Sequence, residues 1–244
     1  MKRNLKDLTG YHIGATDGEV GRVTDFLFDK TSWTIRYIVV ETGNWLAGRK
    51  VLLSPQALQG TDAENKIFKV NLTTDQVKQS PVIDTDKPIG RQQEEELHQH
   101  YPWTGYWGQT HDQWPGGLGT VGMMSHVVTE PLEDAVHHAV HGDDQQIVGG
   151  EVQQTTGTDD DRHLFTTSNV KEYTIAATNG DVGNVDGFII DDSSWKIDSL
   201  IVDTGTWLPG KKVILSPQRI KGLEWLTSCA SIDVSTDEVK HFPE

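Results

Sequence analysis

The sequence has one cysteine, no long apolar run and few basic residues, and each shortage excludes a class of protein. Cys229 alone cannot form an intrachain disulfide or a cysteine-rich metal site. The longest apolar runs, such as residues 37–40, have the length of a strand and fall far short of the about 20 residues that a membrane-spanning helix needs. A net charge of −15 disfavours nucleic acid and anionic membranes as partners. The sequence therefore predicts a chain that neither inserts into a membrane nor binds nucleic acid.

A secretory signal is also missing from the start of the chain. The first ten residues, MKRNLKDLTG, include basic residues but no apolar stretch after them. Hydrophobic residues make up 35% of the 244 residues and charged residues 23%, which is typical of a soluble chain with a long polar portion. These features predict a cytoplasmic protein.

What the sequence does contain is an internal repeat. Residues 16–56 return as residues 178–218 at a constant offset of 162 (178 − 16), without a gap, and roughly half of the paired positions are identical. The shared residues are turn-forming glycines and large apolar anchors, the kinds that define a fold: Gly18 and Gly180, Gly21 and Gly183, Trp33 and Trp195, Trp45 and Trp207. The chain therefore contains one small fold twice.

Each repeat has the pattern of several short strands followed by one short helix. An Asp-Gly pair at 17–18 and an Asn-Gly pair at 179–180 predict hairpin turns. In both repeats, a glycine three positions further on interrupts a long strand and predicts a bulge or a close approach of two backbones. Residues 73–76 and 235–238 have the spacing of a helical capping box, which predicts a short closing helix in each repeat.

Short strands with one terminal helix are typical of a small antiparallel barrel, and the motif behind this pattern resembles a known domain. The stretch TDGEVGRVTDFLFDKTSWTIRYIVVETGNWLAGRKVLLSP, its second copy and the lead-ins LTGYHIGA and VKEYTIAA are similar to the PRC-barrel domain of the photosynthetic reaction centre H subunit and of a ribosome maturation factor. The layout is similar to that of bacterial proteins with two such copies. The resemblance implies a mainly β fold, with two small antiparallel PRC-type barrels, each closed by a short helix, at residues 1–82 and 162–244.

The segment between the predicted barrels, residues 83–161, has a different composition, rich in histidine, tryptophan and glycine. Helix-favouring residues predict a helix over 91–101. A second helix is expected over 131–141, because Pro131 suits a first helical position and Gly142 a helix end. The rest of the segment predicts a flexible chain.

Two groups of apolar residues are candidates for contact surfaces. Aromatic residues of the central segment either bind a partner or fold back over a barrel opening, and the second interpretation is favoured because an exposed patch lowers solubility. In the third strand of each repeat, apolar residues occupy both faces, which predicts contact between the barrels of one chain or in a homodimer, unless the central segment covers them. The candidate interface residues are Ile38, Val40, Leu200 and Val202 in the strands, and Trp103, Tyr106 and Trp107 in the central segment.

Patterns typical of catalysis or cofactor binding are incomplete. The loops GNWLAGRK and GTWLPGKK have the glycine and lysine spacing of a phosphate-binding loop, but a lysine replaces the magnesium-binding hydroxyl residue and a strand follows instead of a helix. His137 and His141 share a helix face with Glu133, yet no second ligand cluster has a metal-binding spacing. Asp29 and Asp191 precede turns and are expected to accept hydrogen bonds from turn N–H groups. We therefore predict no catalytic residue, no cofactor and no metal site.

These observations predict a non-enzymatic binding or scaffold protein that acts through protein contacts of its barrels. The resemblance implies such contacts, because the reaction-centre domain docks on other subunits and the maturation-factor domain engages a ribosomal protein. The sequence shows neither the membrane anchor of the first nor the companion domain of the second, so it does not identify a partner. The alternative is a small-molecule or metal sensor, or a hydrolase, with a site between the barrels or under the His- and Trp-rich segment.

Overall fold

The computed structural model describes residues 1–46, 48–101, 103–108, 162–205, 208 and 210–243. Residues 1–104 and 157–244 form one compact unit, and residues 105–156 form a second. The first unit includes both repeats and the start of the predicted central segment, while η4 (Tyr106–Gly108) belongs to the second. The predicted domain boundaries after residues 82 and 161 stay a prediction.

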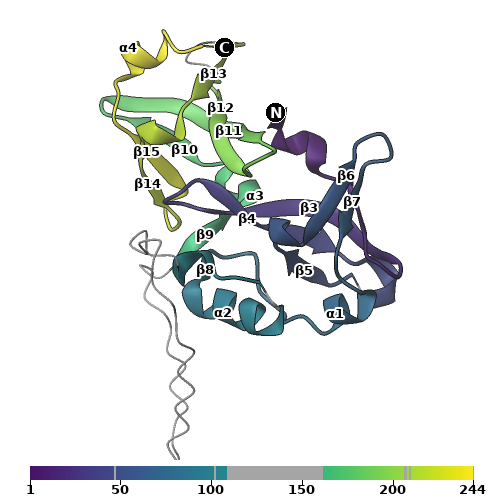
Figure 1. Ribbon diagram of the computed structural model, residues 1–244. Helices are drawn as coiled ribbons and strands as arrows, with labels where there is room; N and C mark the ends of the chain where they lie inside the picture. Colours follow the sequence, from purple (N-terminus) through teal and green to yellow (C-terminus); the bar gives the residue numbers. More distant parts are fainter. Residues whose placement is uncertain (47, 102, 109–161, 206–207, 209, 244) are drawn as a thin grey trace, which may run out of the picture. The chain divides into compact units, whose positions relative to one another are not determined.

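Repeat one, residues 12–78, is built from short strands around two long ones, coloured purple to blue in Figure 1. Its elements are β2 (His12–Gly14), β3 (Glu19–Asp29), β4 (Thr34–Glu41), η2 (Gly43–Leu46), β5 (Lys50–Leu53), η3 (Pro55–Ala57), β6 (Leu58–Asp62), β7 (Ile67–Val70) and α1 (Thr74–Lys78). The strands pair in the order β6-β7-β2-β3-β4-β5, and β2 runs parallel to β7 while the other pairs are antiparallel.

Repeat two, residues 174–239, repeats this arrangement. Its elements are β10 (Thr174–Ala177), β11 (Gly180–Asp191), β12 (Lys196–Asp203), β13 (Lys212–Leu215), η6 (Pro217–Arg219), β14 (Ile220–Glu224), β15 (Cys229–Ile232) and α4 (Thr236–Val239). The strand order is β14-β15-β10-β11-β12-β13, and β10 runs parallel to β15. The register His12↔Ile67 of repeat one recurs as Thr174↔Cys229, so the repeated sequence builds the same backbone pairing twice.

The prediction of a mainly β fold is confirmed, but the strands form an open sheet rather than two closed barrels. Among the described residues, β5 pairs only with β4, and β6 pairs only with β7. The physical reason lies in the link between β5 and β6, where Ser54 caps a 3-10 turn that begins at Pro55. Proline has no N–H group to donate to a ladder, and the turn ends the pairing before the sheet can close.

The lead-in strands of the two repeats are exchanged. β1 (Lys2–Asn4) pairs with β11 of repeat two, and β9 (Arg162–Thr166) pairs with β3 of repeat one. The registers Arg3↔Ile190 and Phe165↔Phe28 are related by the same offset of 162. The short helices that follow are η1 (Leu5–Leu8) and α3 (Thr167–Val170). Each repeat therefore completes the sheet of the other, and Figure 1 shows the N-terminal segment beside β11.

Glycines at equivalent positions permit a close backbone contact in each repeat. A Cβ atom at Gly21 would overlap the carbonyl oxygen of Glu41, and one at Gly183 would overlap that of Asp203. The Gly183 backbone also has a φ of +147°, which side-chain-bearing residues rarely adopt. This is the close approach that the interrupted strand pattern predicts.

The local helix and turn signals are present in both repeats. Capping boxes form at residues 73–76 before α1 and at 235–238 before α4, as predicted. Asp29 accepts hydrogen bonds from the N–H groups two and three residues further on, at 2.9 and 2.7 Å. Asp191 accepts from the N–H group of Ser193 at 3.0 Å. These aspartates therefore hold the turns that precede β4 and β12.

After α1 the chain forms β8 (Ile89–Gly90), which pairs with β9, and then α2 (Arg91–His100), which lies within the range 91–101 where composition favours a helix. The helix expected over 131–141 lies outside the described residues. In the part of the chain that the structure describes, no helix combines the length and the apolar character needed to cross a membrane.

Candidate functional site

The two repeats meet where the strands β4 and β12 begin. The N–H group of Ile35 donates to the carbonyl oxygen of Trp195 at 2.8 Å, and that of Ile197 donates to the carbonyl oxygen of Trp33 at 2.7 Å. Both tryptophans have a left-handed backbone, with φ values of 55° and 57°. The contact is reciprocal, as expected for two copies of one surface that pack about a pseudo-two-fold axis.

The tryptophan rings at this joint have different neighbours although their backbones are equivalent. Trp195 crosses to repeat one, where its ring centroid lies 6.3 Å from Phe26 and 6.0 Å from Phe68. Trp33 instead stacks on Phe28 of its own repeat, with centroids 5.2 Å apart and planes 21° apart. The joint is therefore symmetric in its backbone and asymmetric in its side chains.

Two differences between the repeats explain this asymmetry. The position of Phe28 is occupied by Ile190 in repeat two, and the position of Phe68 by Ala230. Trp195 has no phenylalanine at position 190 to stack on, whereas Trp33 meets no large ring at position 230. A cleft of about 850 Å³ lies at the joint on the side of repeat two.

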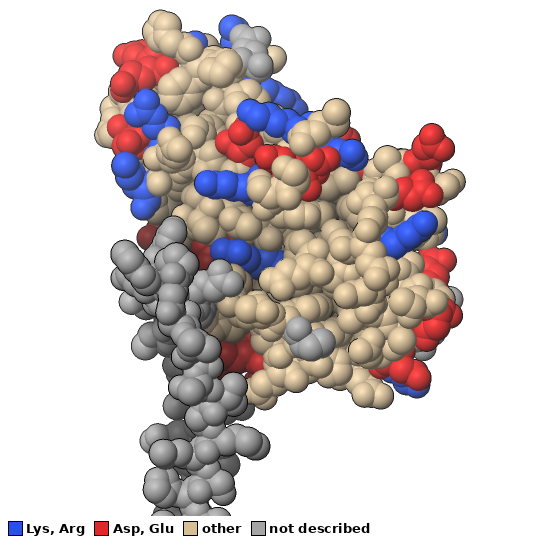
Figure 2. All heavy atoms as spheres, in the orientation of Figure 1, with Lys and Arg blue, Asp and Glu red and all other residues tan. Residues whose placement is uncertain are grey.

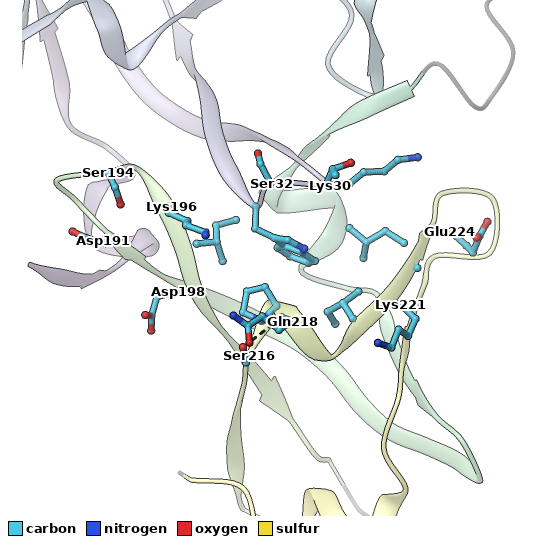
Figure 3. Close-up of a pocket in the computed structure, with 17 residues that line it drawn as sticks. Lys30, Ser32, Asp191, Ser194, Lys196, Asp198, Ser216, Gln218, Lys221 and Glu224 are labelled. Atoms are coloured by element: carbon cyan, nitrogen blue, oxygen red, sulfur yellow. Dashed lines mark hydrogen bonds between the residues drawn. The ribbon is translucent and has the colours of Figure 1, made fainter. Parts of the chain in front are cut away.

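The cleft has an apolar centre and a charged rim. It is lined by the turn that precedes β4, the start of β12, η6 and the whole of β14. The apolar lining comes from Trp33, Ile197, Pro217, Ile220 and Leu223. Figure 3 shows the charged side chains around these residues, with the two aspartates at one end and the lysine and glutamate of β14 at the other.

The two aspartates of the rim already have partners. Hydrogen bonds from the hydroxyl and N–H groups of Ser193 lower the pKa of Asp191 to about 2. Lys2 lies 2.9 Å from Asp198 and, as the largest cause, lowers the pKa of that carboxyl. Both groups are therefore ionised at neutral pH and engaged by other parts of this chain.

The lysines of the rim have fewer charged partners than the aspartates. Lys221 lies 3.1 Å from Asp233, and Lys30 stands over the ring of Phe165, 5.9 Å from its centroid. Neither Lys30 nor Lys196 forms an ion pair with any described residue. Figure 2 shows basic and acidic side chains next to each other on the face of the molecule that it draws, without a single field of one sign. An anionic group would therefore be attracted by the lysines of the cleft and not by the charge of the whole face.

A second hollow of about 220 Å³ continues the cleft along the β14–β15 hairpin. The two hollows share Lys30, Leu223 and Glu224, and the second adds Trp225 and Leu226. The Leu226 side chain is 79% exposed, which places it among the few large exposed apolar side chains in the described part of the chain. Together they form a continuous groove beside β14, called the β14 groove below.

A separate buried cluster surrounds Glu94 of α2, a residue with no exposed surface. The Tyr37 hydroxyl donates to Glu94 Oε1 at 3.0 Å, Arg91 Nη1 donates to Oε2 at 2.6 Å, and His163 Nε2 lies 2.5 Å from Oε2. His98 Nε2 lies 2.9 Å from the Tyr37 hydroxyl. A buried carboxylate is tolerated only with such partners. The cluster connects β4, α2 and β9. It therefore links the part of the chain before residues 109–161 to the part that follows them.

The predicted interface residues of the strands are in the core. Ile38, Val40, Leu200 and Val202 have no exposed surface. The backbone bonds and ring contacts described above join the repeats instead. The role of the four strand residues in an interface stays a prediction.

The predicted aromatic residues of the central segment fall in both units. Trp103, in the first unit, is partly buried and stacks on Tyr101 with ring centroids 4.1 Å apart. Tyr106 and Trp107, in the second unit, contact each other edge to face at 5.0 Å. The side chain of Trp45 and the whole of Trp207 lie outside the described residues.

The basic residues of the glycine-containing loops bind groups of the protein itself. The Arg49 guanidinium donates to the carbonyl oxygens of Lys78 and Ser80, at the C-terminal end of α1. In repeat two, Lys212 lies 2.7 Å from Asp186 and thereby lowers the pKa of that carboxyl. These contacts brace the fold, in line with the interpretation of the loops as structural turns.

The histidines that the structure describes near the central segment also have protein partners. His98 Nδ1 lies 3.1 Å from the carbonyl oxygen of Trp103, and His100 Nε2 lies 2.8 Å from that of Gln76. Within the described ranges, no group of three or more His, Cys, Asp or Glu residues could hold a metal ion. His137 and His141 lie outside those ranges.

Sequence reasoning missed the β14 groove and the Glu94 cluster. A signal for the groove exists, because the β14–β15 hairpin is apolar at three positions where repeat one is small, polar or charged. The pairs are Leu223 and Thr61, Trp225 and Ala63, and Leu226 and Glu64. No signal marks the Glu94 cluster, since Glu94 and His163 are 69 residues apart and follow no shared motif.

Comparison with known proteins identifies the first repeat. Residues 3–77 match the model of the PRC-barrel domain family, so repeat one contains a PRC-barrel domain. An uncharacterized protein of Deinococcus radiodurans is 30% identical over 115 residues, which cover 39% of this chain and 41% of that protein. This chain thus matches less than half of that relative's length. A second PRC-barrel copy stays a prediction.

Proposed function

We propose that the protein is a non-enzymatic binding or scaffold protein in which repeat two is a second PRC-barrel domain. Support for the second domain comes from features that recur at the offset of 162: the strand registers, the capping box and the close glycine contact. The family resemblance implies contacts with other proteins. The exchanged lead-in strands support a joined pair of domains that acts as one body.

The observation that carries the proposal is the cleft at the joint between the repeats. An aromatic anchor in an apolar centre with a polar rim is the usual composition of a protein-binding surface. Trp33, which is 8% exposed, lines the cleft together with the charged residues of its rim. The carboxylates of Asp191 and Asp198 serve a turn and an ion pair, which favours binding over acid-base chemistry.

A double charge reversal in the cleft tests this function. The full chain and a Lys30→Glu/Lys196→Glu variant are immobilised, incubated with lysate of the source cells and analysed by cross-linking and mass spectrometry. The matched control is Lys69→Glu/Lys87→Glu, which makes the same charge change at exposed positions that line neither hollow. We expect the wild type and the control to capture the same protein and the cleft variant to lose it. Capture that is equal for all three chains would contradict the proposal.

A small-molecule sensor is the second candidate, because a cleft of about 850 Å³ is within the roughly 300–1,000 Å³ of small-molecule sites. Native mass spectrometry of the protein purified from its own cells distinguishes the two. A bound mass of a few hundred daltons that is present in the control and absent from the cleft variant would favour the sensor.

A further inference from the structure

The side chains of the β14–β15 hairpin are not explained by the fold. Repeat one forms the equivalent hairpin with Glu64 where repeat two has Leu226, and the backbone pairing is the same. Leu226 is 79% exposed, so it adds little to the core, and an exposed apolar side chain lowers solubility. Trp225 and Leu223 extend the apolar surface of this hairpin into the groove. The apolar character of the hairpin therefore indicates a contact surface.

The backbone of β14 has one free edge among the described residues. β14 is the last strand in the sheet order and pairs only with β15, in the register Leu223↔Ala230. Every residue of β14 lines the cleft, so the free edge faces the groove. Unpaired N–H and C=O groups at such an edge are a template for an added strand. A segment that pairs with all five residues of β14 would span about 16 Å.

The charges of the groove favour an acidic segment. Asp198 is paired with Lys2 and Asp191 is held by its own turn, so neither carboxylate is available to a lysine of the cleft. Lys30 and Lys196 remain without an ion-pair partner in the described part of the chain. Glu224 provides one opposing charge. Carboxylates of a bound segment would therefore lie near lysine ammonium groups that have no ion-pair partner among the described residues. Such charge complementarity speeds association and increases specificity.

We propose that β14 binds an extended segment of a partner protein as an added strand. The segment carries apolar side chains that contact Trp33, Leu223 and Leu226, and carboxylates that contact Lys30 and Lys196. Main-chain hydrogen bonds to the β14 edge supply affinity, and the side-chain contacts supply specificity. This inference rests on the proposed binding function, and it names the chemistry of the partner at the same site.

Synthetic peptides test the proposal on the full chain. The first probe is a heptapeptide, blocked at both ends, in which leucine alternates with aspartate. The second has lysine in place of aspartate, and the third is the acidic peptide with methyl groups on alternate backbone nitrogens, which removes the N–H donors of one strand edge. Affinities are measured by isothermal titration calorimetry at about 0.1 M salt, where charge contacts are only partly screened. We expect the acidic peptide to bind and each of the other two to bind at least tenfold more weakly.

Hydrogen exchange locates the bound peptide. With the acidic peptide at saturation, we expect slower exchange of the amides in residues 220–224 and unchanged exchange in the equivalent strand, residues 58–62. The second strand is a matched internal control, because it is the equivalent strand of repeat one and ends the other side of the sheet path. Slower exchange in both strands, or in neither, would contradict binding at β14.

Variants separate the charge contacts from the apolar ones. Lys30→Glu/Lys196→Glu should weaken the acidic peptide at least tenfold and strengthen the lysine peptide, whereas Lys69→Glu/Lys87→Glu should change neither. Leu226→Glu, which introduces the residue of repeat one, should weaken the acidic peptide about fivefold or more. An unchanged unfolding midpoint for each variant shows that the loss is local.

The outcomes distinguish this inference from the function on which it rests. Strand addition is wrong if backbone methylation leaves the affinity unchanged, or if no peptide binds while the cleft variant still loses the captured protein; the binding function then stands. Both are wrong if no peptide binds and capture does not depend on the cleft. Binding of the lysine peptide in preference to the acidic one would overturn the assigned chemistry of the partner.

Discussion

Repeat one and repeat two share their strand registers and their turn contacts, but they use equivalent side-chain positions differently. Phe68 of repeat one fills the space beside Trp195, whereas Ala230 occupies that position in repeat two, at the joint where the cleft lies. Tyr37 of repeat one reaches the buried Glu94, whereas the equivalent Ser199 binds its neighbour Asp198. Identical positions thus define the backbone, whereas positions that differ set the side-chain contacts of Trp195 and of Tyr37.

The exchanged lead-in strands limit how independent the repeats can be. β1 adds to repeat two and β9 adds to repeat one, so the removal of either repeat would leave the other with an unpaired edge on its long strand. The repeats therefore diverge in their side chains while their backbones remain coupled. Four measurements test how far the two repeats differ in their side-chain contacts.

The largest effect is expected at the Glu94 cluster, which only repeat one reaches. Glu94→Ala leaves Arg91 and His163 without the carboxylate between them, so we expect the free energy of unfolding to fall by about 3–5 kcal/mol. The measurement is urea denaturation. Glu95→Ala removes an exposed carboxylate from the same helix and should change stability by less than about 0.5 kcal/mol. Similar losses in the two variants would mean that the cluster contributes nothing specific.

The second effect concerns the aromatic packing at the joint. Phe68→Ala removes a buried ring that contacts Tyr11 and Trp195, and it should cost about 3 kcal/mol or more. The reverse exchange, Ala230→Phe, adds volume to a buried site in repeat two and should cost about 1–3 kcal/mol. Denaturant titrations of both variants check the difference. If Ala230→Phe stabilises the chain, the space beside Ala230 is already large enough for a ring.

The third effect is a dependence on pH in the attachment of β1. The pKa of Asp191 is about 2, and the pKa values of Asp192 and Asp198 are also lowered, by the N-terminal ammonium group and by Lys2 respectively. Because these values are depressed below 3.8, their stabilisation is complete above about pH 4 and is lost as pH falls towards 2. We expect the hydrogen-exchange protection of β1 to fall in this range.

The equivalent strand β9 provides the comparison for that measurement. Its residues Leu164 and Phe165 are buried, so apolar contact contributes to its attachment to β3, in addition to the contact of His163 with Glu94 and the hydrogen bonds to Asp25 just after the strand. Protection of β9 should therefore change less than that of β1 between pH 4 and pH 2. Equal loss in the two strands would indicate that the whole unit opens.

The smallest effect is expected for Leu226→Glu. Because Leu226 is exposed and its counterpart in repeat one is a glutamate, the free energy of unfolding should change by less than about 0.5 kcal/mol. Thermal unfolding followed by circular dichroism checks this expectation. A loss above about 1 kcal/mol would show that the leucine is part of the core and does not belong to a contact surface.

The sequence by itself determined the features that depend on residues close together along the chain. The hairpin turns, the capping boxes and the turn aspartates are stabilised by hydrogen bonds that span two or three residues, so their residue types and spacing suffice to predict them. The repeat also indicated that the strand pairing of one copy recurs in the other at the same offset. Even the close contact at Gly21 is indicated, because only glycine leaves room for a neighbouring backbone.

The tertiary structure alone decided which partner each element meets. Nothing local indicates that β1 pairs with β11 or that His163 lies on Glu94. The burial of Ile38 and Val40 is another case, since an apolar residue on a second strand face can be covered by the same chain or by another. Such contacts join residues tens of positions apart, and their free energy depends on how whole surfaces fit together, which residue spacing does not specify.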